Sequence, residues 1–182
     1  MLTTAEALEK VLAAMPELAA EAAEVSAATG RILRQTVVAE RDQPPFDRVM
    51  MDGIALAHAD LAAGTTSLPI QCTQMAGEPA KSLEAGKAIE IMTGASLPVG
   101  ADCIVPVERI TIDDGVAVLE DGYVAEVRQF IHPRASDHAQ GCELLVPGKR
   151  ISPLDIAVVT SAGLTEVAVS RAPVMLIILI GY

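Results

Sequence analysis

The sequence predicts an α+β protein that is rich in β-strands. Helix signals flank a central region, residues 46–139, in which short β-branched runs are separated by Gly, Pro and Asp. Hydrophobic residues make up 51% of the chain and charged residues 20%, which is the composition of a globular protein. We therefore expect a helical and β first domain that is interrupted by a small β-rich insert.

The first helix is predicted by the residues at its start. Thr3 can cap the helix, and Glu6 completes a capping box. An amphipathic helix is expected because the next apolar residues share one helical face before Pro16: Leu8, Val11, Leu12 and Met15.

Residues 17–34 predict a second, shorter helix, and the segment after them predicts a strand. Their Ala and Glu content favours a helix near Ser26–Leu33, and β-branched residues favour a strand over Thr36–Ala39. The segment Asp42–Asp47, with its pair of prolines, predicts a turn. A domain boundary is expected at this turn.

The central region has the pattern of a small β domain. Asp113-Asp114-Gly115 predicts a hairpin, because Asp-Gly tolerates the positive φ angles that such turns require. The strands expected here are Ile54–Ala57, Ile70–Met75, Ala88–Met92, Cys103–Pro106, Val116–Leu119 and Tyr123–Arg128.

A helix and a strand then return the chain to its first domain. Ser152 is expected as the N-cap and Pro153 as the first helical residue, and Asp155 lies where the helix dipole favours negative charge. Gly163 supplies the C-terminal stop. Glu166–Ser170 alternates apolar and polar residues and predicts a strand that pairs with the N-terminal portion of the chain.

The charge of the chain argues against nucleic acid as a partner. The 13 basic and 24 acidic residues give a net charge of −11, which repels a phosphate backbone. Two Phe, two Tyr and no Trp leave little to stack on bases. An anionic substrate therefore needs a local cluster of Arg and Lys or a bound divalent cation.

The N-terminus, the last apolar run and the cysteines indicate a cytoplasmic protein with no membrane partner. The opening MLTTAEALEK lacks the basic and apolar regions of a secretory signal. The run Val174–Ile180 is shorter than the roughly 20 residues that cross a bilayer, and it is expected to be a buried strand. Cys72, Cys103 and Cys142 have no metal or redox spacing and are expected to be buried, reduced thiols.

Two Gly-containing loops carry candidate site residues. Asp47 and Asp52 lie five apart, so that one or both carboxylates can bind a hard cation. The alternative, which spacing alone favours, is that Asp52 and Gly53 only form a turn. Thr93-Gly94 follows an apolar strand and can present N–H groups and a hydroxyl to an oxyanion, but a plain turn again explains the pattern.

A third loop, residues 131–141, holds the densest polar group of the chain. His132, Arg134, Asp137 and His138 fall within seven residues. These side chains can form a metal site, although solvated loop charge is the more common outcome for such a cluster.

The three loops resemble those of a known family. PPFD followed by MDGIALA resembles the family stretch PPFDNSAMDGYA, and IMTGASLPVGADCIVPVE is similar to its IMTGA, Pro, GAD and VPVE elements in the same order. HPRASDHAQG, followed by LLVPGKRISP and DIAVVTSAG, resembles its arginine-GED loop and the helix after it. The family is the molybdopterin molybdenumtransferases of the MoeA and gephyrin E type, and the resemblance covers residues 4–173.

The resemblance implies a fold and a reaction. Members are elongated homodimers, in which the first domain would comprise residues 1–45 plus 140–172 and the insert residues 46–139. Residues 173–182 would be the stub of a pterin-binding α/β domain. The implied reaction is the Mg²⁺-assisted insertion of molybdate into adenylylated molybdopterin with release of AMP. A molybdopterin-adenylylating protein or domain would be the partner.

The resemblance also assigns site residues. Asp52, Thr93 and Asp137 match catalytic positions of the family. Asp52 and Asp137 would hold the metal, and Arg134 and Gly94 would bind the cofactor.

The chain departs from the family pattern near these residues. Arg48-Val49-Met50 stands where the family has Asn-Ser-Ala, Ile54 where it has Tyr, and Ala135-Ser136 where it has Gly-Glu. The sequence ends in VMLIILIGY, where the pterin domain would run into a Ser-Thr-Gly-Asp-Glu segment. The 182-residue chain alone is therefore expected to be inactive. The alternative hypothesis is a non-catalytic dimerising scaffold or an inactive truncated variant of the same family.

Overall fold

The computed structural model describes residues 2–174 and 176, and it divides into two compact units. Unit 1 comprises Met1–Glu40 with Gly141–Tyr182, and unit 2 comprises Arg41–Gln140. A compact unit is not yet a separately folding domain, so the division at residues 46–139 stays a prediction that proteolysis can test. The expected strand Val174–Ile180 lies almost wholly outside the described residues.

The fold is β-rich, as predicted, with few helices. In unit 1 the first helix, α1, spans Thr4–Ala14 and carries the predicted capping box. The Thr3 hydroxyl accepts a hydrogen bond from the Glu6 backbone N–H, and the Glu6 carboxylate accepts one from the Thr3 N–H at 2.7 Å. The helix begins where its cap residues predict because these bonds satisfy backbone donors that the first turn leaves open.

The helix predicted near Ser26–Leu33 is wrong. Strand β1, Ala20–Glu24, pairs in antiparallel register with β12, Glu166–Ser170, and only a short 3-10 turn, Val25–Ala27, follows it. Helix propensities differ by less than about 1 kcal/mol per residue. In the predicted range itself, the Gly30 and Leu33 N–H groups donate to the Ile151 and Lys149 carbonyls, so these distant partners outweigh the weak helical preference. The strand predicted at Glu166–Ser170 is confirmed.

The core of unit 1 lies under the last helix, α3, Pro153–Ser161. Ser152 caps this helix as predicted, since its hydroxyl accepts from the Asp155 N–H and the Asp155 carboxylate accepts from the Ser152 N–H. The predicted strand at Thr36–Ala39 is present as the shorter β2, Val37–Val38, which pairs with β11, Glu143–Leu145. The largest buried apolar residues of this core are Val25, Leu33, Val37, Leu145, Ile151, Val159, Val167 and Val169.

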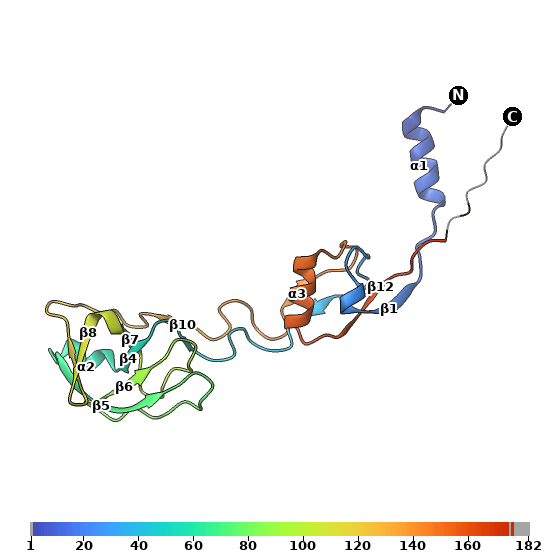
Figure 1. Cartoon of the computed structure of the whole chain (residues 1–182). Helices are drawn as coiled ribbons and strands as arrows, with labels where there is room; N and C mark the ends of the chain where they lie inside the picture. The colour runs from blue at the N-terminus through green and yellow to red at the C-terminus, as the bar shows by residue number, and fades with distance from the viewer. Residues whose placement is uncertain (1, 175, 177–182) are drawn as a thin grey trace. The chain divides into compact units, whose positions relative to one another are not determined.

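Unit 2 is built on one curled sheet with the strand order β7-β4-β6-β5-β9-β8 (Figure 1). Five of the strands predicted for the central region are confirmed within a few residues. A short helix, α2, His58–Ala62, follows β4. The strands of the sheet are β4 (Gly53–Leu56), β5 (Ser67–Gln74), β6 (Ala88–Ile91), β7 (Cys103–Pro106), β8 (Ile110–Asp113) and β9 (Val116–Leu119).

Both faces of this sheet are buried in its centre. Ile54 and Leu56 pack into one apolar cluster, and Ala55, which points to the opposite face, packs into another. Successive residues of a strand face opposite sides of a sheet, so a strand buried on both sides is a continuous apolar run. This arrangement explains why β4 and β7 lack the alternation of a half-exposed strand.

The loops of unit 2 contain one confirmed turn and one wrong strand. The predicted hairpin joins β8 to β9, with Asp114 and Gly115 at positive φ. The strand predicted over Tyr123–Arg128 is absent, because its backbone bonds go elsewhere: Arg128 N–H donates to the Asp102 carbonyl, and Arg128 itself has a φ of 65°. The loop leads into strand β10 (Ile131–His132). This strand pairs with β3 (Arg48–Val49), and the sequence did not indicate either strand.

All three cysteines are free thiols, but they are not all buried. Cys103 is buried in the sheet, Cys72 is half-buried and Cys142 is exposed. The expectation of three buried thiols therefore holds only for Cys103; it is wrong for Cys142, which lies outside the core of unit 1, and half-buried Cys72 does not meet it either. Across residues 2–174 and 176, no helix is both long enough and apolar enough to cross a membrane.

Candidate functional site

Two strand ends of unit 2 bring the first two candidate residues together. Strands β4 and β6 are antiparallel, with Gly53 opposite Ile91. The residue before β4, Asp52, therefore lies beside the segment that leaves β6 and leads to Thr93. This pairing joins residues 41 positions apart in the sequence.

Thr93 holds the Asp52 carboxylate with two donors. Its backbone N–H and its hydroxyl donate to the same oxygen, Asp52 Oδ1, at 2.6 and 2.7 Å. The backbone hydrogen bond, followed by that of the hydroxyl, lowers the pKa of Asp52 from its usual value. Asp52 and Thr93 are both exposed, and Thr93 donates to only one of the two carboxylate oxygens. The oxyanion that Thr93 binds in this structure is thus the carboxylate of the protein itself.

The glycines in these motifs have different structural roles. A Cβ on Gly53 would overlap the Val105 carbonyl oxygen, so the close approach of β7 requires glycine there and the turn interpretation does not account for it. Gly94 does lie in a turn, with a φ of 88° and a hydrogen bond from Ala95 N–H to the Met92 carbonyl. Its own N–H donates to the Val49 carbonyl at 2.9 Å, so Gly94 anchors the Thr93 turn to β3.

A hollow of about 300 Å³ lies beside this turn and is called the Thr93 hollow below. It joins residues of three segments: β3 with the residue after it, the Thr93-Gly94 turn, and β10. Its lining residues are Arg48, Val49, Met50, Thr93, Gly94 and His132.

Asp137 is connected to this hollow through His132. The His132 Nε2 and Asp137 Oδ1 atoms are 3.0 Å apart, and the Asp137 backbone N–H donates to the Gln43 carbonyl at 2.9 Å. Of the four polar residues in the third loop, the structure therefore brings His132 and Asp137 together. Asp137 itself remains exposed.

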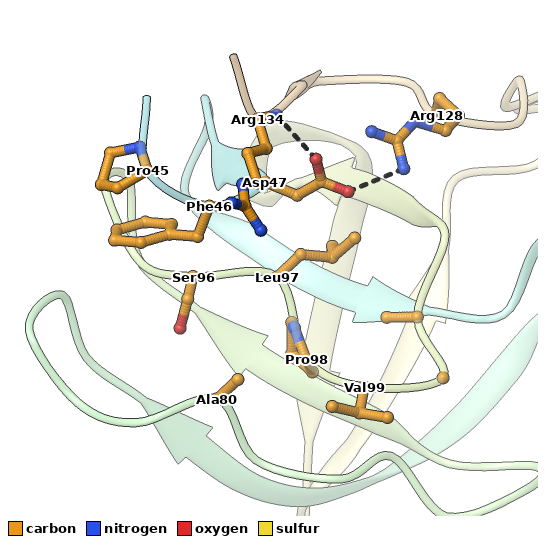
Figure 2. A pocket seen from close by; sticks show the side chains of 12 residues that line it. Pro45, Phe46, Asp47, Ala80, Ser96, Leu97, Pro98, Val99, Arg128 and Arg134 are labelled. Atoms are coloured by element: carbon orange, nitrogen blue, oxygen red, sulfur yellow. Dashed lines mark hydrogen bonds and ion pairs between the residues drawn. The ribbon is translucent and has the colours of Figure 1, made fainter. Parts of the chain in front are cut away.

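Arg134 lies at a different hollow, of about 500 Å³ (Figure 2). Its guanidinium Nε donates to Asp42 Oδ2 at 2.6 Å, and its backbone N–H donates to Asp47 Oδ1 at 2.8 Å. Within the described chain it makes no hydrogen bond or ion pair with Asp52, Thr93 or Asp137. The sequence-predicted residues thus lie at different places in unit 2: Thr93 and Gly94 line the Thr93 hollow, and Arg134 lines the second hollow. Asp52, although bonded to Thr93, lines a separate hollow of about 230 Å³ with Gly53, Glu90 and Met92.

Asp47 is the centre of the second hollow. Its carboxylate lies between the Arg134 backbone and the Arg128 guanidinium, whose Nη1 is 2.9 Å from Asp47 Oδ2 (Figure 2). The Arg128 hydrogen bond is the main cause of its lowered pKa. Sequence reasoning considered Asp47 for cation binding and missed Arg128, because the two residues are 81 positions apart. Both Asp47 oxygens are used by protein donors, which makes this residue a poor cation ligand.

Metal binding cannot come from a ready-made cluster in these loops. The described residues contain no group of three or more His, Cys, Asp or Glu side chains that could hold an ion. Mg²⁺, however, is commonly bound through one or two carboxylates, with water and substrate phosphates as the other ligands. Asp52 fits that mode, because its side chain is exposed and Thr93 donates to only one of its two oxygens.

Solved structures share this fold. A molybdopterin biosynthesis MoeA protein from Pyrococcus horikoshii matches with a TM-score of 0.82 at 29% sequence identity, over 91% of this chain and 45% of that chain. A further structure of a Pyrococcus MoeA protein matches with a TM-score of 0.80 at 27% identity, over 95% of this chain and 45% of that chain. The chain therefore shares the fold of a little under half of each of these proteins.

Sequence comparison identifies the family. Residues 2–163 match the family model of the MoeA N-terminal region, domains I and II, and the chain belongs to this family. A molybdopterin molybdenumtransferase of Synechocystis sp. is 35% identical over all of this chain and 47% of its own length. One of Synechococcus elongatus is 33% identical over 97% of this chain and 46% of its own length. The chain spans about half the length of these relatives.

Proposed function

We propose that this chain acts in molybdenum cofactor biosynthesis, and that it supplies one wall of a site for inserting molybdate into adenylylated molybdopterin with release of AMP. The observation that carries the proposal is the Asp52 carboxylate, held ionised and exposed by Thr93 at the meeting of two strand ends. Family membership and the names of the relatives support the reaction class. The complete activity belongs to a protein that also contains the other half of those relatives.

In this proposal Thr93 holds the negative charge of the Asp52 carboxylate in a fixed position. Thr93 fixes one oxygen of Asp52, which keeps a negative charge at one position without side-chain rearrangement. His132 fixes one oxygen of Asp137 in the same manner. Gly94 holds the Thr93 turn against β3, and Gly53 lets β7 approach close behind Asp52.

We propose that Asp52 and Asp137 hold Mg²⁺, with water and substrate oxygens as the remaining ligands. The acidic chain, with its net charge of −11, otherwise repels the anions that the reaction brings together. When bound, Mg²⁺ supplies charge neutralisation between these anions. Arg134 and Gly94 are proposed to contact the cofactor, Arg134 at the second hollow and Gly94 at the Thr93 hollow.

The assembly proposed for this function rests on the family resemblance alone. It is a cytoplasmic homodimer that receives its substrate from a molybdopterin-adenylylating protein or domain.

The experiment that tests the function uses a chimera of this chain with the second half of the Synechocystis relative. Asp52→Asn should lower molybdate insertion by at least about 100-fold, as expected for loss of a group that acts on the reacting centre. The melting temperature should stay nearly unchanged because the side chain is exposed. Asp121→Asn, at an exposed carboxylate of the same unit, is the matched control and should leave both quantities unchanged.

Thr93→Val refines the assignment. It removes the hydroxyl donor and keeps the backbone donor, so that activity should fall less than in Asp52→Asn. Full activity of Asp52→Asn together with a large loss of stability would return Asp52 to a structural role. A wild-type chimera that folds and dimerises without any insertion activity would favour the scaffold hypothesis.

A further inference from the structure

Arg48 is the feature of the Thr93 hollow that the proposed function does not use. It lies on β3 directly opposite His132 of β10, and its side chain is half-buried at the wall of the hollow. Within the described chain its guanidinium has no carboxylate at ion-pair distance. Among the described residues, its side chain makes a hydrogen bond with His132 Nδ1, at 3.4 Å.

The other arginines of unit 2 show how unusual this environment is. Arg109 is paired with Glu120, Arg128 with Asp47 and Arg134 with Asp42. Arg41 also lacks a carboxylate partner among the residues that the structure describes, but it is exposed and lies outside the Thr93 hollow. Arg48 is thus a half-buried cation in a strongly acidic chain, and no carboxylate of the residues that the structure describes lies at ion-pair distance from it.

The contact with His132 orients the guanidinium. An arginine can only donate, so His132 Nδ1 must accept and must carry no proton. The proton of the neutral ring is then on Nε2, where it donates to Asp137 at 3.0 Å. One tautomer satisfies both contacts, and the order Asp137–His132–Arg48 holds the arginine side chain in place.

Most donors of Arg48 remain available. A guanidinium has five N–H groups in a planar fork that matches two oxygens of a phosphate-like anion. The His132 contact uses one of its nitrogens, Nη2. The carboxylate linked to Arg48 through His132 is Asp137, and its Oδ1 is paired with His132 Nε2.

We propose that the Thr93 hollow binds a tetrahedral oxyanion through Arg48. The class of ligand includes molybdate and the phosphate groups of a nucleotide or pterin substrate, because all present paired oxygens to a guanidinium. The volume of about 300 Å³ is at the small end of ligand sites, which span roughly 300–1,000 Å³, and suits an ion better than a whole cofactor. A role of this hollow in the insertion reaction rests on the proposed function. Oxyanion binding by Arg48 can be measured whether or not the proposed function is correct.

The test is calorimetric titration of the 182-residue chain with sodium molybdate and, separately, with inorganic phosphate. The wild-type chain should show saturable binding of one ion. Arg48→Gln should weaken it at least about tenfold, since it removes a charge-assisted pair of hydrogen bonds. Arg48→Lys should give an intermediate loss, because lysine keeps the charge without the planar fork. Arg41→Gln is the matched control and should bind within about twofold of the wild type.

The outcomes separate the source of the ligand from the existence of the site. Tighter binding of molybdate assigns the hollow to molybdate, and equal or tighter binding of phosphate assigns it to a phosphate group. No saturable binding of either ion, or equal weakening by Arg48→Gln and Arg41→Gln, overturns the inference and leaves the Asp52 experiment standing. Intact oxyanion binding in a chimera without insertion activity would count against the proposed function instead.

Discussion

Asp155 is a buried carboxylate whose charge the structure predicts to stabilise unit 1. It is 5% exposed, at the third position of α3. Its Oδ1 accepts from Lys149 Nζ at 2.6 Å, and its Oδ2 accepts from the Ser152 N–H at 2.8 Å and hydroxyl at 2.7 Å. The Lys149 hydrogen bond, followed by those of Ser152, lowers the pKa of Asp155 from 3.8 to about 2.

The magnitude and the sign follow from this pKa. One unit of pKa shift corresponds to about 1.4 kcal/mol, so the Asp155 charge contributes at most about 2 kcal/mol to the free energy of unfolding. This is an upper value, because the Lys149 side chain is half-exposed and solvent screens its charge. The folded pKa is lower than the unfolded one, so the contribution is complete above pH 5 and is lost as the pH falls through about 2. Roughly half of it should remain near pH 3.

The assay is urea unfolding of Asp155→Asn, followed by circular dichroism at pH 7 and at pH 3. The loss of unfolding free energy should be about 2 kcal/mol at pH 7 and clearly smaller at pH 3. Glu6→Gln is the control, because Glu6 occupies the same capping-box position in α1 but is exposed. An equal loss at both pH values would show that the shape of the carboxyl group matters and its charge does not. A loss of the same size in Glu6→Gln would refute the role of burial.

Three further predictions concern unit 2 and the thiols. Gly53→Ala should lower the free energy of unfolding in urea by about 1–3 kcal/mol, because the added Cβ meets the Val105 carbonyl. The control Gly64→Ala, at positive φ in open space, should lower it by about 1 kcal/mol or less. Equal losses in the two variants would contradict the close approach of β7 to Gly53. Burial, with a smaller effect of Asp102, raises the pKa of Cys103 to about 11, so a thiol reagent at pH 8 should label exposed Cys142 first and Cys103 only on unfolding. Limited proteolysis should cut within 43–48 or 136–141 if the insert is a domain, and cleavage concentrated within 88–128 would count against it.

Local signals determined the helix ends and the short turns of this protein. Thr3 and Ser152 begin their helices where the sequence indicates, because a cap bonds to the backbone only three residues ahead. The Asp114-Gly115 turn follows from residues that tolerate positive φ. The ranges of β4, β6 and β7 were likewise indicated by short apolar or β-branched runs between Gly, Pro and Asp.

Strand pairing, by contrast, was decided only by the tertiary structure. Ala20–Glu24 has a helical composition and becomes a strand because β12 offers it a partner. Tyr123–Arg128 has a strand-like composition and does not become one because its backbone bonds to the Asp102 loop. Propensity is a weak local preference, and distant hydrogen-bond partners override it.

The candidate site shows the same division between local and distant information. Motifs in the sequence indicated Asp52, Thr93 and Asp137, but not their contacts. The register of β4 against β6 places Thr93 on Asp52, and the pairing of β3 with β10 places Arg48 beside His132. Arg134, only three residues from Asp137 in the sequence, bonds instead to Asp42 and Asp47 at the other hollow. Proximity along the chain does not determine which groups meet, because the direction of each side chain is determined by the strand or turn that carries it.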